Sequence, residues 1–446
     1  MASGQTSPRE LAEHITDHIR QVDSAAGGTH SVLALVADVA AVAHQAPAGP
    51  LHGIPILIKD NIEAVGLPAT AGSLALAGHP VTHDADLVAR LRAAGALVVG
   101  STNLSEWANM RSPKSTSGWS AVGGLTRNPW DLSRSAGGSS SGSGAALAAG
   151  LAPLAMGTET DGSIVCPAAL NGVVGIKPTV GRVSTRGVIP ISASQDSPGP
   201  MARSVADTAA LLDVLIGTQS VQALSDSSPL RVGVVRQWLT GDDETNTLFY
   251  DAVDTLARAG VTIVAIDVPD ITDEADQDEG QVLVCELLED MAAYLAGRGV
   301  PGVQTLADVV AFNHAHADEE LVHFGQEHFE RAVASGGRNA QYDQARARNM
   351  QWATHEVLEP ALHDVDVVIG CLYGPAWPIA LGQGDDFGAS SWMTTAPAVA
   401  GWPIGSLPMG LCRGTGSELP VGLGVAARRN DEVGLVRAMA RRELVW

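Results

Sequence analysis

Apolar residues fall into short runs that alternate with amphipathic stretches along this chain. Residues 8–45, which begin PRELAEHITDHIRQVD, have a helical pattern, with Ser7 as the N-cap and Pro8 at the helix start. The run Ile54–Ile58 predicts a buried strand, and DADLVARLRAAGALVVGSTN predicts a helix followed by a second buried strand, Ala96–Gly100. Alternating helices and apolar strands favour an α/β sheet.

The second half of the chain shows the same alternation. LRVGVV (230–235) and VTIVAIDV (261–268) bracket a helical stretch, as in a βαβ unit. Residues 274–333 are helical and acidic, and three further strands and a closing helix are predicted at VDVVIG (365–370), at the strand ending in PMG (408–410), at LPVGLGVAA (419–427) and at DEVGLVRAMARRE. We find no internal repeat.

The centre of the chain, residues 137–163, is dense in glycine and serine. A flexible linker of this composition would remain polar throughout. Here the sequence instead continues into the small-residue helix AALAAG, the apolar run LAPLAMG and a second Gly/Ser turn. Glycine-rich turns on both sides of a small-residue helix indicate close backbone packing around a site.

The formal net charge is -22, from 49 Asp and Glu against 27 Lys and Arg. Nucleic-acid binding depends on Lys and Arg that neutralise phosphates, so we expect no nucleic-acid partner. An anionic membrane surface is disfavoured for the same reason. The chain has no apolar run of about 18 residues and no apolar leader at its start. We therefore expect a cytoplasmic protein, with a trimmed leader left open, that is a monomer or a homo-oligomer.

The cysteines and histidines do not predict a metal site. Cys166, Cys285, Cys371 and Cys412 form no CxxC pair, which argues against a zinc knuckle and a disulfide framework. His314 and His316 are two residues apart and so do not share a helix face. We expect neither a metal nor another cofactor.

Lysine is rare in this sequence: only Lys59, Lys114 and Lys177 occur, and the other 24 basic residues are arginines. Lys59 follows the apolar run ILI at the end of a predicted strand. A desolvated lysine can lose its proton and act as a base, which arginine cannot do. The alternative is a salt bridge from Lys59 to Asp60 or Glu63.

Two serine-containing turns are candidates for nucleophilic chemistry. Ser139 follows two glycines, and Ser163 lies 24 residues later in TDGSI. A serine nucleophile needs a base within hydrogen-bond reach and backbone N–H groups directed at the oxyanion. A phosphate-binding or purely structural glycine turn is the alternative, although GxxxxGK[ST] is absent. GSSSG (138–142) matches the elbow of the α/β-hydrolases, but no convincing apolar strand precedes it.

Two sequence blocks, in the same order, resemble the amidase signature family. They are HGIPILIKDNI (52–62) and GGSSSGSGAALAAG…GTETDGSIVCPAALNGVVGIKPTVGRVS (137–184), and the similarity continues through SQDSPGPMARSVADTAALL (194–212). Within the family the chain is most similar to bacterial peptide amidases, in NLSEWANMRS (103–112), SGWSAVGGLTRNP (117–129), residues 306–329 and GDDF (384–387). The resemblance implies one large domain over residues 1–446, with a central mixed sheet covered by helices on both faces. Its core would span about 50–215, and a variable helical region of about 270–400 would shape the substrate site.

The resemblance also implies roles for individual residues. Ser163 corresponds to the nucleophile, Ser139 to a bridging serine that follows a cis peptide bond, and Lys59 to the base. The oxyanion hole would consist of the backbone N–H groups of Thr160, Asp161, Gly162 and Ser163. The sequence differs from the commoner family pattern in two places: Asp161 gives TDGS in place of TGGS, and Ser141 gives SSSG in place of SSGG.

The function that this resemblance implies is hydrolysis of a carboxamide through an acyl-enzyme on Ser163, with release of ammonia. The substrate would be the C-terminal amide of a peptide. The alternatives are a general amidase for small aliphatic, aryl or amino-acid amides, an A-type component of a tRNA-dependent amidotransferase, and a non-catalytic binding protein on the same fold.

Several residues are candidates for substrate contacts. Aromatic side chains could line a groove for a peptide or small-molecule amide, and Asp386 could face the substrate, although aromatic residues are more often part of a core. The aromatic candidates are Trp107, Trp119 and Phe387, together with Trp377, Trp392 and Trp402.

Overall fold

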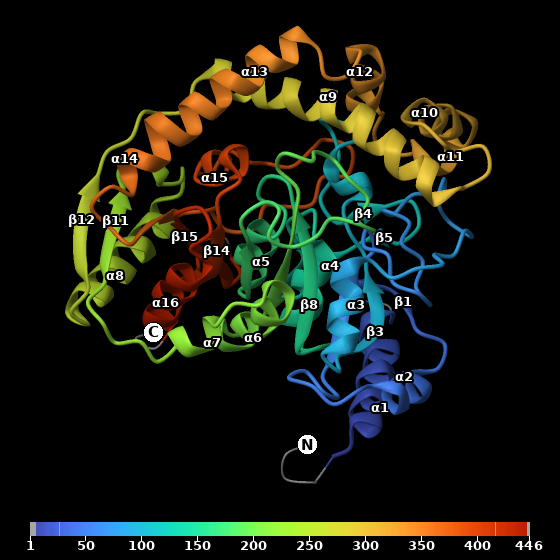
Figure 1. Cartoon of the computed structure of the whole chain (residues 1–446), viewed down its shortest axis with the longest axis horizontal. Coiled ribbons are helices and arrows are strands. Elements are labelled where there is room, and N and C mark those ends of the chain that lie inside the picture. Colours follow the sequence, from blue (N-terminus) through green and yellow to red (C-terminus); the bar gives the residue numbers. More distant parts are fainter. Residues whose placement is uncertain (1–5, 26, 415, 444–446) are drawn as a thin grey trace.

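A mixed sheet of eleven strands runs through the described part of the molecule (Figure 1). The computed structural model describes residues 6–25, 27–414 and 416–443. From one edge to the other the strands are β1 (Val32–Leu35), β3 (Leu97–Thr102), β2 (Pro55–Lys59), β8 (Leu154–Glu159), β10 (Ser197–Ala202), β9 (Val174–Lys177), β14 (Ile404–Cys412), β15 (Leu419–Ala427), β13 (Val367–Cys371), β11 (Arg231–Val235) and β12 (Thr262–Ile266).

Strand directions divide the sheet into parallel and antiparallel parts. Strand β2 lies between β3 and β8 and is parallel to both, and β11 is parallel to its neighbours β12 and β13. The strands between these two groups, from β8 across to β13, pair antiparallel. Parallel strands need cover on both faces, and all five residues of β2 are buried.

Two layers of helices provide this cover, one on each face. Leu57 of β2 packs in the cluster that contains α1 (Pro8–His18) and α4 (Ser141–Ala148), while Ile56 and Ile58 pack on the other face. The layer around Leu57 also holds α5 (Val165–Asn171) and α15 (Thr395–Ala400), and the opposite layer holds α3 (Asp86–Ala93), α6 (Val205–Ile216), α8 (Asp243–Arg258) and α16 (Glu432–Glu443). The prediction of a central mixed sheet with helices on both faces is confirmed.

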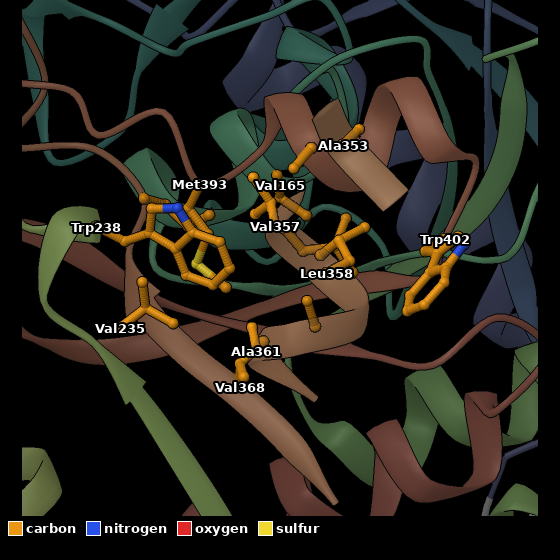
Figure 2. Packing of buried hydrophobic residues seen from close by; sticks show 14 of the residues in the cluster. Val165, Val235, Trp238, Ala353, Val357, Leu358, Ala361, Val368, Met393 and Trp402 are labelled. Atoms are coloured by element: carbon orange, nitrogen blue, oxygen red, sulfur yellow. The ribbon is translucent and has the colours of Figure 1, made fainter. Parts of the chain in front are cut away.

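The largest core cluster joins the second half of the sheet to a helical segment above it. Figure 2 shows Val357 and Leu358 of η4 (Gln351–Leu358) near Val368 of β13, with Trp238 at one side of the cluster. All four side chains are fully buried. This packing attaches the end of the helical region 270–400 to the sheet.

The remaining helices lie outside these two layers. In Figure 1, α9 (Asp273–Arg298) and α13 (Ala340–Met350) run side by side along the outside of the molecule. The cluster that holds α9 includes Trp107 and Phe329, so this helix packs against the first half of the chain. The other short elements are η1 (Ile19–Asp23), α2 (Val39–Gln45), η2 (Glu106–Asn109), β4 (Trp119–Ser120), β5 (Gly124–Leu125), β6 (Arg127–Asn128), β7 (Asp131–Ser135), α7 (Ser220–Ala223), η3 (Arg236–Trp238), α10 (Leu306–Ala315), α11 (Ala317–Glu320), α12 (Glu327–Ser335) and α14 (Glu359–Ala361).

The predicted elements agree with the structure except near the N-terminus. Ser7 caps α1 and Pro8 is its first residue, as predicted. The expectation that residues 8–45 are helical throughout was wrong, because Val32–Leu35 forms the edge strand β1, antiparallel to β3. Leucine and alanine favour helices intrinsically, and here pairing with β3 overrides that preference.

A buried ionic cluster joins the helical region to the first half of the chain. Arg111 is fully buried and contacts Glu106 at 2.6 Å and Glu320 at 3.4 Å. Its guanidinium also donates to the Glu320 carbonyl oxygen at 2.5 Å and lies over the Phe324 ring. Two carboxylates thus depend on one cation.

Replacing Arg111 should therefore destabilise the protein strongly. We expect Arg111→Met to lower the free energy of unfolding by about 3–5 kcal/mol, because the two carboxylates are left without a counterion in the interior. Urea denaturation followed by circular dichroism measures this. Arg9→Met is the control, because Arg9 forms an exposed pair with Glu13 and its loss should leave the urea midpoint unchanged. Equal midpoints for the two variants would contradict the assignment.

Candidate active site

Lys59 is the last residue of β2, in the parallel part of the sheet, and its side chain is fully buried. Its Nζ lies 2.8 Å from Ser139 Oγ and 2.8 Å from Thr158 Oγ1, and 3.3 Å from the Thr158 carbonyl oxygen. The amide of Asn61 donates to the same Thr158 hydroxyl at 3.0 Å. Lys59 is thus held by neutral oxygens alone and points at Ser139.

This environment weakens the proton affinity of Lys59. Burial lowers the pKa of its ammonium to about 7, while the negative charges of Asp196 and Glu159 act in the opposite direction. A lysine with such a pKa is partly neutral near pH 7, which is what a general base requires.

The alternative of a salt bridge from Lys59 is not what the structure contains. Asp60 accepts hydrogen bonds from the backbone of Ala69 and Thr70 and from the Thr70 hydroxyl. Glu63 accepts a hydrogen bond from the Tyr294 hydroxyl at 2.8 Å. In the described residues, neither carboxylate pairs with Lys59.

Ser139 lies just before α4, and the peptide bond that joins it to Gly138 is cis. A Cβ at position 138 would lie 2.3 Å from Ser105 Oγ and 2.5 Å from Ser117 Oγ, so only glycine fits there. The Ser139 carbonyl accepts a hydrogen bond from the Ser105 backbone N–H at 3.1 Å. These contacts fix the segment that presents Ser139 to Lys59.

Ser163 lies in the turn between β8 and α5, and it is 8% exposed. Its carbonyl oxygen accepts a hydrogen bond from the Ser140 backbone N–H at 3.1 Å, which joins the two serine-containing turns. Glu159 Oε2 accepts from the N–H groups of Ile164 and Val165, at 2.7 and 2.9 Å, at the start of α5. The carboxylate thus holds the far side of the turn.

Three N–H groups of this turn are available to a ligand. No described residue accepts a hydrogen bond from the backbone N–H of Asp161, Gly162 or Ser163. Buried N–H groups are almost always paired in folded proteins. Unpaired donors at the wall of a cavity therefore fit a site for a carbonyl oxygen or an oxyanion.

Ser163 and Asp161 line a cavity of about 340 Å³. A second cavity of about 610 Å³ adjoins it and shares Asp161, Tyr373 and Phe387 with it. Burial raises the pKa of Asp161, although the hydroxyls of Thr394 and Thr395 oppose the shift. Asp161 thus lies where the two cavities meet.

The aromatic residues expected to contact a substrate divide into two groups. Phe387 is 52% exposed and lines both cavities, and Trp392 lines the second cavity. Trp107 is buried edge-on against Phe329, and neither it nor Trp119 is among the residues that line the two cavities. The other candidates are likewise core residues, packed as follows: Trp119 against Phe324 and His323, and Trp377 and Trp402 in the largest core cluster.

Asp386 is exposed and accepts a hydrogen bond from Gly388 in its own loop. The preceding residue, Asp385, lines the cavity that contains Ser163. It accepts from the backbone N–H and the hydroxyl of Ser117, at 3.1 and 2.6 Å, and from Trp377 Nε1 at 3.1 Å. The sequence indicated the right loop, but only tertiary contacts identify the residue.

Tyr373, which the sequence pattern did not single out, forms the wall that the two cavities share. It follows β13 and is 7% exposed, and a Cβ at Gly162 would lie 2.4 Å from its hydroxyl oxygen. Its position at the end of a predicted strand was the one available signal.

Two further properties follow from the described residues. They contain no group of three His, Cys, Asp or Glu side chains arranged to hold a metal ion. His314 instead lies 3.4 Å from Glu330, and His316 stacks on Phe312. None of the described helices is long and apolar enough to span a membrane.

The chain belongs to the amidase family, whose model matches residues 10–436, and it is an amide-hydrolysing enzyme. It is 34% identical to the A-type component of the glutamyl-tRNA(Gln) amidotransferase from Anaeromyxobacter sp. (strain K), over 98% of this chain and 93% of that protein. It is also 40% identical to the "Probable amidase" of Arabidopsis thaliana, over 64% of this chain and 60% of that relative.

Among solved structures, the chain is most informatively compared with native peptide amidase from Stenotrophomonas maltophilia. The two are 40% identical, with a TM-score of 0.92, and the match covers 99% of this chain and 94% of that one. The similarity to peptide amidases noted in the sequence thus extends to the three-dimensional structure.

Gly162 should be essential because of its conformation and its close contact with Tyr373. Its φ is +74°, and an added Cβ would displace the turn that holds Ser163. We expect Gly162→Ala to lower kcat/KM for amide hydrolysis by roughly 100-fold. Adding Tyr373→Phe should restore part of the loss, because the clashing oxygen is removed.

Gly181→Ala is the matched control for this substitution. Gly181 has a φ of +84°, but nothing lies within 4 Å of a Cβ built there. Gly181→Ala should keep the wild-type kcat/KM. If Gly162→Ala were as active as Gly181→Ala, the turn would not need its observed position.

Proposed function

We propose that the protein hydrolyses the C-terminal carboxamide of peptides, through an acyl-enzyme on Ser163 and a Ser–Ser–Lys relay. The observation that carries this proposal is the 2.8 Å contact between a buried Lys59 and Ser139, beside a turn that exposes Ser163 to a cavity. Serine is a weak nucleophile and needs a base that can take its proton.

Acylation begins when neutral Lys59 accepts the hydroxyl proton of Ser139. Ser139 in turn takes the proton of Ser163 as Ser163 Oγ attacks the amide carbonyl carbon. The resulting oxyanion is stabilised by backbone N–H groups of the turn from Thr160 to Ser163.

The C–N bond then breaks, and the relay returns the proton to the departing nitrogen, so that ammonia leaves and an ester of Ser163 remains. Deacylation repeats the sequence with water. The same base takes a proton from the water that attacks the ester, and the proton returns to Ser163 Oγ as the carboxylic acid is released.

A peptide substrate is favoured by the size and the charge of the site. The two adjoining cavities of about 340 and 610 Å³ exceed what a small aliphatic amide needs. Their lining includes four carboxyl groups and, in the described residues, neither Lys nor Arg: Asp161, Asp273, Asp276 and Asp385. Such a site favours neutral and cationic peptides over acidic ones. The similarity to peptide amidase supports the same choice.

The amidotransferase relatives support a second candidate, a protein that hydrolyses glutamine for a partner enzyme. The identity to these relatives is 34%, against 40% for the peptide amidase. Glutamine hydrolysis that depends on partner chains would favour this candidate.

A panel of amides tests the proposed substrate class. We expect ammonia release from peptide amides, with much lower kcat/KM for acetamide, benzamide and free glutamine. Among acetylated tripeptide amides, one with a lysine side chain should exceed one with an aspartate side chain by about tenfold in kcat/KM, because of the acidic lining. Ser163→Ala should reduce all these activities by roughly 10⁴-fold or more.

Ser225→Ala is the control, because Ser225 is an exposed residue far along the chain from the site and should keep full activity. Hydrolysis confined to small amides would overturn the peptide assignment and leave the relay intact. Full activity of Ser163→Ala would overturn the relay itself.

The pH dependence follows from Lys59. Because burial lowers its pKa to about 7, the amine is mostly neutral above that pH and mostly protonated below it. With an acetylated, uncharged peptide amide, we expect kcat/KM to rise with pH through a midpoint near 7. Well below the midpoint it should fall by about tenfold for each pH unit, as the neutral fraction does.

Lys59→Arg should be inactive over the whole range, since arginine stays protonated. A profile that remains flat from pH 8 down to pH 5 would contradict the role of Lys59 as base.

A further inference from the structure

The loop of residues 191–196, which precedes β10, connects the serine turn to the outer helix α9. At its inner end Asp196 Oδ1 accepts a hydrogen bond from the Thr160 hydroxyl at 2.6 Å. Asp196 Oδ2 accepts from the backbone N–H groups of Ile191 and Ser192, at 2.8 and 3.0 Å. One buried carboxylate therefore fixes both the loop and the first residue of the turn that carries Ser163.

The outer side of this loop is held by carboxylates of α9. Glu286 Oε2 accepts from the Ser192 hydroxyl at 2.6 Å and from the Ser194 backbone N–H at 3.0 Å. Asp290 Oδ2 accepts from the Ala193 backbone N–H at 2.8 Å. Further along the loop, Glu279 Oε1 accepts from the Gln195 side-chain amide at 2.7 Å.

These acceptors all lie on one face of α9. Glu279, Glu286 and Asp290 are spaced by seven and four residues, which keeps them on the same side of a helix. Asp276 and Leu283, which share this face, line the two cavities. A single helix face thus forms part of the substrate site and holds the loop behind the serine turn.

We infer that α9 positions the turn of Ser163 through the 191–196 loop, with Glu286 as a positioning residue and Asp196 and Thr160 as the link. A catalytic turn displaced by about 1 Å can lose roughly 100-fold in rate. The contacts of Thr160 lie on the side of the turn that must stay fixed while Ser163 reacts. The inference rests on the proposed function, since it concerns the same site.

The test is a double-mutant cycle on the full-length enzyme, with a peptide amide that the wild type hydrolyses. Thr160→Val removes the hydroxyl that donates to Asp196, and should lower kcat by about tenfold with KM within about twofold. Glu286→Ala removes the acceptor of two loop donors, and should lower kcat by roughly fivefold, again with little change in KM. Because both act through one chain of contacts, the double variant should lose about tenfold and not the roughly fiftyfold of independent effects.

Glu289→Ala is the matched control. Glu289 is on the same helix and accepts hydrogen bonds from Arg338, which also contacts Asp290, but it has no contact with the loop among the described residues. Its kcat should stay within about twofold of wild type. Melting temperatures of all variants identify loss of folding. If Glu286→Ala does not fold, Ser192→Ala, which removes one of the loop's bonds to Glu286, should show the same coupling to Thr160→Val.

Additive losses in the double variant, a change in KM without a change in kcat, or equal effects of Glu286→Ala and Glu289→Ala would each overturn the inference. Failure of the proposed function is distinguishable, because the wild-type enzyme would then hydrolyse no peptide amide. A wild-type enzyme that is active, with additive variants, defeats the inference alone.

Discussion

The hydrogen bond between Lys59 and Ser139 is the constraint on which the rest of this site depends. It places an amine with no solvent exposure at the end of a central parallel strand, among hydroxyl and carbonyl oxygens. Burying a lysine without a paired carboxylate is costly, and the cost is what lowers its pKa to about 7. The same cost requires a rigid surround, because water or a mobile carboxylate would restore the ordinary pKa.

The surround comes from segments that are far apart in the sequence. Thr158 and Ser139 approach Lys59 from strand β8 and from the segment before α4. Glu159 and Asp196 then fix the two sides of the turn that holds Ser163. Both carboxylates also raise the pKa of Lys59, so the groups that hold the turn influence the base as well. Geometry and proton affinity are thus set by the same residues.

The sequence predicted the fold well where a segment's own pattern decides its structure. Strand β15, at Leu419–Ala427, was predicted to the residue, because a continuous apolar run between turns has one stable arrangement in a buried sheet. Strand β1 was missed, since its four residues are as compatible with a helix as with a strand until β3 pairs with them.

The candidate site shows the same division. The rarity of lysine and the two glycine-rich turns pointed to Lys59, Ser139 and Ser163 from the sequence alone, and these residues remain a proposal for chemistry. The substrate side was not predictable, because burial and direction decide it. Trp107 is a core residue, and Asp385 faces the cavity while its neighbour Asp386 faces away. The bonds from α9 to the 191–196 loop join residues more than 80 positions apart, and no local pattern reports them.

The acyl-enzyme offers the most direct test of the central claim, that Ser163 is the nucleophile of a relay based on Lys59. Rapid acid quench of the enzyme during turnover of a peptide amide, followed by digestion and mass spectrometry, locates the covalent intermediate. The account predicts that the acyl group of the substrate is found on the peptide that contains Ser163, as an ester of that residue. An acyl group on Ser139 or Ser141, or a burst of product with no covalent species at any serine, would contradict it.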